Sequence, residues 1–148
     1  MAILSIMVSS NIDPDAFYLR PVKSSDEDYQ PALSYDAVKA EYEKIGGREL
    51  NDLENKFASA QHLLSKAEKI NFTFAALKAK NTIGAYYIES RKPGAAGLAY
   101  KYLFEAYNES LKFNEPDLQS EIATNYALAL WKRGEKSRAK QMVEKEYE

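Results

Sequence analysis

Residues 125–139 read Asn-Tyr-Ala-Leu-Ala-Leu-Trp-Lys-Arg-Gly-Glu-Lys-Ser-Arg-Ala, and this stretch decides the fold. We expect one helix over about residues 117–133 and another over about 136–147, because Gly134 between them permits the left-handed backbone that ends a helix. Ala139 follows five residues after this glycine and gives the second helix a small side chain where it crosses the first. The stretch therefore predicts two antiparallel helices joined by a tight turn.

The same pattern occurs 40 residues earlier in the chain. In this alignment Gly94 pairs with Gly134, and Ala99 pairs with Ala139. Self-similarity at a fixed period is the signature of stacked structural repeats, so we predict a second helix–glycine–helix unit. The further pairs are Tyr86 with Tyr126, Lys92 with Lys132, Leu103 with Val143 and Tyr107 with Tyr147.

Residues 120–145 resemble a tetratricopeptide repeat, with the glycine of the turn and the alanine five residues later at that family's positions. Residues 81–107 resemble a weaker copy. The spacing of 40 differs from the family's 34, Tyr87 stands at the family's small residue in the first copy, and Glu146 replaces its later alanine. Residues 34–72 match only loosely. The resemblance implies antiparallel helix pairs stacked as a short α-solenoid; an unrelated bundle of α-hairpins is the alternative.

Apolar spacing and helix-breaking residues divide the rest of the chain into four more expected helices. They cover about residues 34–45, 48–70, 74–91 and 95–113, and the second of them has apolar residues at steps of three or four, which is the pattern of one helical face. Beyond the first 33 residues we find no alternation with the period of two that a half-buried strand shows. The predicted fold class is all-α.

The first 33 residues differ from the rest of the chain. Pro14, Pro21 and Pro31 exclude a continuous helix there, so we predict an irregular N-terminal arm at residues 1–33 and a helical repeat domain at 34–148. A permanently exposed run of apolar residues from Phe17 to Val22 would be adhesive. We therefore expect the arm to lie against the helical body.

Composition excludes several classes of protein. The 148 residues carry 20 Lys and Arg against 22 Asp and Glu, with no Cys and one His, which removes disulfide scaffolds, thiol nucleophiles and metal sites built on two imidazoles. We expect no cofactor. Neither half of the chain has the concentrated positive charge that nucleic acids require. The apolar start at residues 1–8 is far shorter than a membrane span. A soluble, cytoplasmic protein is favoured, with a processed or truncated exported protein as the alternative.

Residues typical of catalysis are few. His62 is a lone histidine within a predicted helix, which is more typical of a packing or surface residue than of a base. Glutamates two apart, such as Glu41 and Glu43, point to different sides of a helix and do not share a proton or a metal. Gly94-Ala-Ala-Gly97 lacks the lysine of a phosphate-binding loop. No enzymatic activity is expected.

Tyrosine is unusually frequent, with 11 residues in the chain. Six tyrosines lie within residues 86–126. We expect Tyr86, Tyr107 and Tyr126 to fill contacts between helices, and the remaining three to line an inner groove: Tyr87, Tyr100 and Tyr102. A tyrosine offers a large apolar ring with a polar tip at low rotamer cost, which suits the capture of a peptide.

The tetratricopeptide resemblance assigns the inner face to the first helix of each pair. It implies the following partner-binding positions: Asn81, Ala85, Ile88, Glu121, Thr124, Asn125, Leu128 and Lys132. Only Asn125 fits the sets that grip a C-terminal carboxylate in that family, so a groove for an extended or helical segment is the better match. The predicted function is a non-catalytic protein–protein interaction module: an adaptor, chaperone, scaffold or assembly factor. The alternatives are a self-associating structural subunit, which is a homodimer with its groove filled by its own arm or a second copy, and a helical-bundle enzyme.

Overall fold

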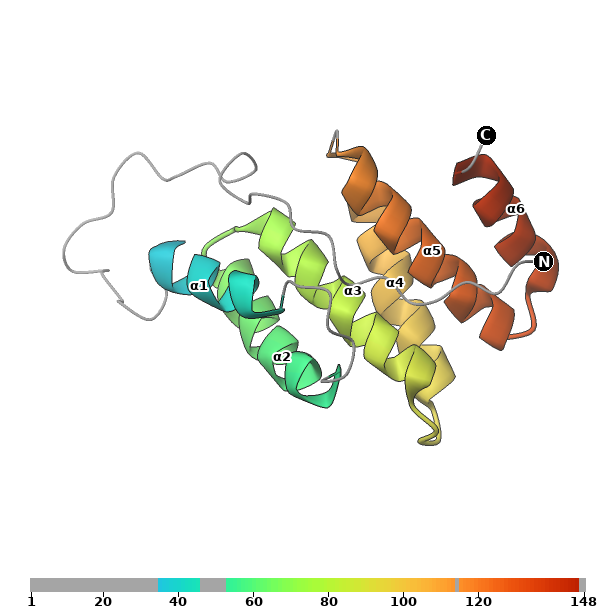
Figure 1. Cartoon of the computed structure of the whole chain (residues 1–148), viewed down its shortest axis with the longest axis horizontal. Helices are drawn as coiled ribbons and strands as arrows, with labels where there is room; N and C mark the ends of the chain where they lie inside the picture. Colours follow the sequence, from blue (N-terminus) through green and yellow to red (C-terminus); the bar gives the residue numbers. More distant parts are fainter. Residues whose placement is uncertain (1–34, 46–52, 114, 147–148) are drawn as a thin grey trace.

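A computed structural model describes residues 35–45, 53–113 and 115–146. The regular secondary structure of these residues is entirely helical, and the six helices are α1 (Tyr35–Ile45), α2 (Leu53–Lys69), α3 (Thr73–Glu89), α4 (Ala95–Ser110), α5 (Pro116–Lys132) and α6 (Lys136–Glu146). Consecutive helices pack antiparallel, and the pairs α1–α2, α3–α4 and α5–α6 stack side by side (Figure 1). The predicted all-α class and the short α-solenoid are confirmed. The predicted arm at residues 1–33 lies outside the described residues.

The observed helix ends follow the breakers in the sequence. Pro116 occupies the first turn of α5, where a missing amide hydrogen costs nothing, and the Glu115 side chain accepts a hydrogen bond from the Asp117 amide at 2.9 Å. Helix α4 ends at Ser110, three residues before the predicted end, because the amides of Lys112 and Phe113 bond to carbonyls three residues back. Such bonds tighten the chain into turns.

Helix α3 lies at the centre of the stack and contacts α1, α2, α4 and α5. It is therefore buried nearly all round, which explains why its sequence is rich in alanine and other apolar residues and why even Lys78, Asn81 and Thr82 are buried. A first core cluster joins α1, α2 and α3 to the start of α5, and a second joins the end of α3 to α4, α5 and α6. Their largest fully buried side chains are Leu63, Phe72, Phe74, Leu77, Ile83, Leu103, Leu118, Ile122 and Leu130.

Both predicted glycine turns have left-handed backbone. The φ angle is +80° at Gly94 and +87° at Gly134. Ala99 and Ala139, the two predicted small residues of the second helices, are buried. The small residue of the first helix in the α3–α4 pair is Gly84, not position 87: a Cβ atom there would lie 2.4 Å from Cγ of Leu103.

Two large apolar residues of the helix predicted at residues 95–113 are not in the core. Leu98 and Leu111 are 38% and 58% exposed. The buried side of α4 instead carries mainly small residues, because α4 packs closely on α3, and Leu111 lies beyond the last turn of α4. The buried residues of α4 are Ala95, Ala99, Leu103, Ala106 and Ser110.

Candidate functional site

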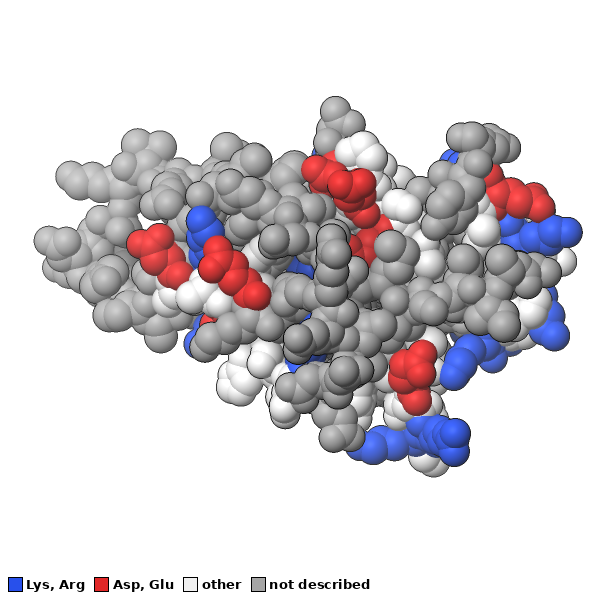
Figure 2. All heavy atoms as spheres, in the orientation of Figure 1, with Lys and Arg blue, Asp and Glu red and all other residues white. Residues whose placement is uncertain are grey.

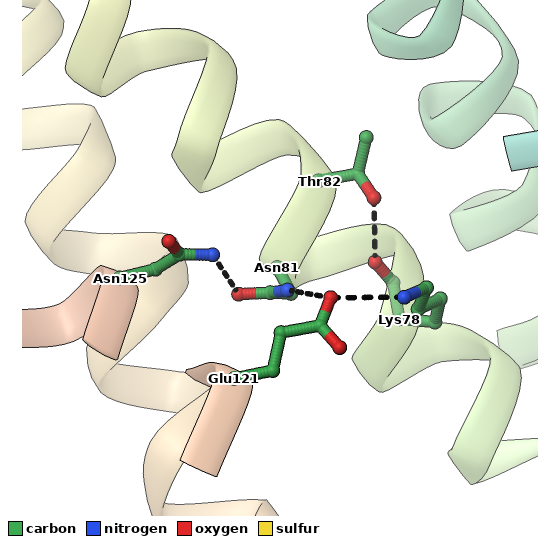
Figure 3. A network of polar contacts seen from close by, with 5 residues as sticks. All are labelled: Lys78, Asn81, Thr82, Glu121 and Asn125. Carbon is green, nitrogen blue, oxygen red and sulfur yellow. Dashed lines mark hydrogen bonds and ion pairs between the residues drawn. The ribbon is translucent and has the colours of Figure 1, made fainter. Parts of the chain in front are cut away.

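A buried polar network connects α3 to α5 (Figure 3). Nζ of Lys78 lies 2.9 Å from Oε1 of Glu121, and each of these side chains is 1% exposed. Asn81 donates to the same carboxylate oxygen at 3.1 Å and accepts a hydrogen bond from Asn125 at 2.8 Å. Thr82 donates to the Lys78 carbonyl at 3.0 Å. Side-chain hydrogen bonds thus connect Lys78 and Asn81 of α3 with Glu121 and Asn125 of α5.

The network serves packing more than chemistry. Burial lowers the pKa of Lys78, while the Glu121 charge opposes this effect and the Lys56 charge adds to it. A buried ion pair loses much of its Coulomb energy to desolvation, but removing one partner leaves a charge inside the protein. The paired atoms must therefore meet in one alignment of α3 with α5. We interpret the network as a device that fixes this alignment.

The network contains three of the eight predicted partner-binding residues, and the structure brings the set together along α3 and α5. Six of the eight are buried: Asn81, Ala85, Ile88, Glu121, Thr124 and Asn125. Leu128 is half-buried. Lys132 is exposed, and its ammonium donates to the Ile88 carbonyl at the end of α3. A partner would reach the six buried residues only if their packing opened, and their role in binding stays a prediction.

A second set of residues presents aromatic rings at the surface. Tyr100, Phe104 and Tyr107 recur along α4 at the spacing of one helical face, and each contacts the Tyr126 ring of α5, with centroid distances of 5.9, 6.2 and 5.4 Å respectively. Tyr100 and Phe104 also stack on each other at 5.7 Å. Tyr126 is buried beneath them, whereas Phe104 is 42% exposed. The result is an aromatic platform in which the Phe104 ring is exposed and the Tyr100 and Tyr107 rings are half-buried.

Two arginines border this platform. The Arg133 guanidinium lies 3.9 Å from the centroid of the Tyr100 ring, within the range of a cation–π interaction. Arg138 donates to the Tyr126 hydroxyl at 3.2 Å and to Oε1 of Glu135 at 2.8 Å. Glu135 also lies 3.7 Å from Arg133. One carboxylate therefore faces two guanidinium groups that are 39% and 51% exposed. We call these six residues the aromatic–arginine surface: Tyr100, Phe104, Tyr107, Tyr126, Arg133 and Arg138.

The electrostatics of this surface keep the Tyr126 hydroxyl neutral and the Arg138 guanidinium charged. The pKa of Tyr126 is raised mainly by burial and secondly by a hydrogen bond with Tyr100. The pKa of Arg138 is raised mainly by a hydrogen bond with Glu135 and secondly by one with Tyr100. The surface therefore offers an apolar ring beside a permanent cation. This combination suits an apolar side chain and a carboxylate of a binding partner.

Sequence reasoning missed Phe104, Arg133 and Arg138 as candidates. The available signal was the spacing of Tyr100, Phe104 and Tyr107, which places three aromatic rings on one side of a helix. Of the three tyrosines expected to line an inner groove, Tyr100 belongs to the aromatic–arginine surface, and Tyr87 and Tyr102 lie outside it. Tyr87 and Tyr102 stack at 6.1 Å, and Tyr87 also contacts Phe57 of α2.

The three tyrosines expected to fill contacts between helices do so. Tyr126 is buried, and Tyr86 and Tyr107 are half-buried. Tyr86 stacks on Phe57 with 4.0 Å between centroids, and Tyr107 packs against both core clusters.

Other kinds of site have little support in the described part of the chain. His62 is exposed, as expected for a surface residue. No group of three His, Asp or Glu among residues 35–45, 53–113 and 115–146 is arranged to hold a metal ion. None of the helices described is both long and apolar enough to cross a membrane. Two open pockets lie along α2, α3 and α4, and one of them contains the ion pair of Lys80 with Glu109 at 2.7 Å.

Comparison with protein-family models, with curated proteins and with solved structures finds no significant match for this chain.

Proposed function

We propose that this chain is a non-catalytic protein–protein interaction module whose aromatic–arginine surface binds a segment of a partner protein. The observation that carries the proposal is the exposed but well-packed ring of Phe104. Its ring is 42% exposed, yet contacts with Tyr100 and Tyr126 hold it in place. A large apolar side chain that is rigid and exposed loses little entropy when a partner covers it.

The chemistry of the surface favours a protein segment over a small molecule. The surface extends along α4 and across to the first turn of α6, instead of enclosing a pocket of the kind that surrounds small ligands. Arg133 and Arg138 add cations at its border, and arginine and aromatic residues are enriched where proteins bind one another. A segment with one apolar side chain and one carboxylate would satisfy both features.

The resemblance to tetratricopeptide repeats supports the same proposal. The stacked antiparallel helix pairs are compatible with a helical repeat, and such solenoids present extended surfaces to protein partners. We extend the proposal to an adaptor, chaperone or assembly factor, three roles that share this mode of binding.

The test places a photo-crosslinking phenylalanine analogue at position 104 of the full chain and identifies the proteins captured in the source cells. The same analogue at position 111, which is 58% exposed beyond the end of α4, is the matched control. We expect a protein captured from position 104 and not from 111. The affinity of the captured protein is then measured on the chain without the analogue. It should fall at least about tenfold when the chain carries Phe104→Ala or Arg138→Ala, and it should stay unchanged with Leu111→Ala.

Three results would overturn the proposal. The first is equal capture from both positions, and the second is an affinity that neither Phe104→Ala nor Arg138→Ala changes. The third is capture of a second copy of the chain, which would favour the self-associating structural subunit. Molecular mass in solution then provides a separate check, since a dimer has twice the 16.8 kDa of one chain.

A further inference from the structure

Basic residues gather along one edge of the solenoid, at the helix ends where α3 turns into α4 and α5 turns into α6. Figure 2 shows blue Lys and Arg atoms along this edge, at the lower right of the molecule. We call this surface the turn end and define it by five exposed residues: Arg91, Lys92, Lys132, Arg133 and Lys136.

The fold places the two turns next to each other. Lys132 at the end of α5 donates a hydrogen bond to the carbonyl of Ile88 at the end of α3, so the carboxyl ends of these helices are in contact. Gly94 and Gly134 then reverse the chain at the same end through left-handed backbone. Cations from two turns that are far apart in the sequence therefore share one surface.

The turn end has a clear excess of positive charge. Residues 88–92 and 132–136, which form the two turns, contain these five cations and only two carboxylates, Glu89 and Glu135. Glu135 pairs with Arg133, and among the described residues no carboxylate lies within ion-pair distance of Arg91 or Lys92. Cations near a helix carboxyl end are stabilised by the helix dipole, but this effect requires neither this number of charges nor their concentration over two turns.

The turn end is continuous with the aromatic–arginine surface. Arg133 belongs to both and lies over the Tyr100 ring. On another side, Nζ of Lys136 lies 5.1 Å from the centroid of Trp131, which is 37% exposed. Leu98 in the first turn of α4 is 38% exposed. Cations interspersed with accessible apolar groups suit a peptide better than a bare polyanion.

We infer that the turn end docks an acidic protein segment, which continues from the apolar anchor on Phe104 across Arg133 to Arg91 and Lys92. This inference rests on the proposed function, because it takes the partner to be a protein. The net charge of −2 for the whole chain opposes long-range attraction of a nucleic acid, whose binding depends on many phosphate contacts. A short acidic segment needs only the local charge of the turn end.

The test measures binding of a fluorescein-labelled hexaglutamate peptide to the full chain by fluorescence anisotropy at low ionic strength. The double variant Arg91→Glu with Lys92→Glu reverses two exposed charges at the turn end. The matched control, Lys69→Glu with Lys112→Glu, reverses two exposed charges at the opposite ends of the helices, where α2 turns into α3 and α4 turns into α5. It gives the same change in net charge. Circular dichroism confirms that both double variants keep their helices.

We expect saturable binding that weakens with added salt. The turn-end double variant should lower the affinity at least about tenfold and the control less than about threefold, because local charges dominate over net charge. Absence of saturable binding, or equal losses in the two variants, would overturn the inference. So would tighter binding of an oligothymidylate probe by the same residues, since this result would point to a nucleic acid.

The hexaglutamate probe has no apolar side chain, so its binding is independent of Phe104. If the probe fails to bind while the affinity of the captured partner still falls with Phe104→Ala and Arg138→Ala, only the acidic-segment inference is wrong. If Phe104→Ala and Arg138→Ala leave partner affinity unchanged, the proposed function is wrong.

Discussion

The crossing of α3 and α4 provides a quantitative test of the packing. Gly84 is helical and buried, and a Cβ atom added there would lie 2.4, 2.8 and 2.9 Å from the Cγ, Cδ2 and Cδ1 atoms of Leu103. Ordinary contacts of this kind are about 3.5–4.0 Å, so the Leu103 side chain would have to retreat. It is fully buried and has no empty space to enter in a close-packed core.

Gly84→Ala therefore combines two opposing effects. Replacing a helical glycine by alanine raises the free energy of unfolding by up to about 1 kcal/mol. Overpacking a core lowers it by about 1–3 kcal/mol. Gly97 in α4 is the matched control, because an added Cβ atom there meets nothing within 4 Å. We expect Gly97→Ala to be stabilising, and Gly84→Ala to be less stable than Gly97→Ala by the overpacking energy of about 1–3 kcal/mol.

Urea unfolding followed by circular dichroism measures both variants, and a double variant identifies the cause. Leu103→Ala alone should destabilise by about 2–5 kcal/mol. In this background the clash is gone, so Gly84→Ala should become neutral or stabilising. Equal stabilities of Gly84→Ala and Gly97→Ala would refute the close crossing. The same penalty for Gly84→Ala with and without Leu103 would show that another contact causes it.

Three further substitutions test the turns and the second core. Gly134→Val should destabilise by about 1–2 kcal/mol, because φ is +87° and left-handed backbone disfavours residues with a Cβ atom; a thermal melt unchanged from the wild type would contradict this. Ala139→Leu should lower the free energy of urea unfolding by about 1–3 kcal/mol, since Ala139 is fully buried; wild-type stability would show that the α5–α6 crossing is loose. Burial raises the pKa of Tyr126 above its usual value of about 10, so its stabilising effect is present below that pH and lost as the pH rises through the folded-state pKa. The free energy of unfolding should therefore fall more steeply above about pH 10 in the wild type than in Tyr126→Phe, and equal slopes would contradict the raised pKa.

The sequence predicted the helices well because the signals are local. Breakers such as Gly134 and Pro116 act on the few residues around them, and the six helices lie within a few residues of their predicted ranges wherever the structure describes them. The close contact at Gly84 was missed because the 40-residue alignment was anchored on the glycine turns. The connection between α3 and α4 is longer than that between α5 and α6, so the first helices of the two pairs are offset in this alignment.

Side-chain exposure was harder to predict than helix position, and the buried network shows why. Register along the first helices correctly grouped Asn81, Glu121 and Asn125, which form one hydrogen-bonded set. Polar residues are usually exposed, so a polar group on a predicted inner face resembles a binding surface. Here Lys78 and Glu121, 43 positions apart, neutralise each other when α3 packs against α5. This pairing becomes visible only when two helices that are far apart in the sequence pack against each other.

The same argument explains why the residues with the strongest claim to partner binding escaped prediction. Phe104, a large apolar residue within a helix, would ordinarily be assigned to the core, and Arg133 follows a helix end, where basic residues are common. Neither stands out alone. Their proposed role in binding depends on α4 and α6 flanking α5 closely enough for Tyr126 to support Phe104 from below while Arg133 and Arg138 border it. In a solenoid, helix pairing follows from local patterns, whereas the proposed binding surface arises from the stacking of pairs. Substitutions of its exposed members, Phe104 and Arg138, should therefore separate binding from stability, whereas substitutions of buried residues at the stacking contacts should change both.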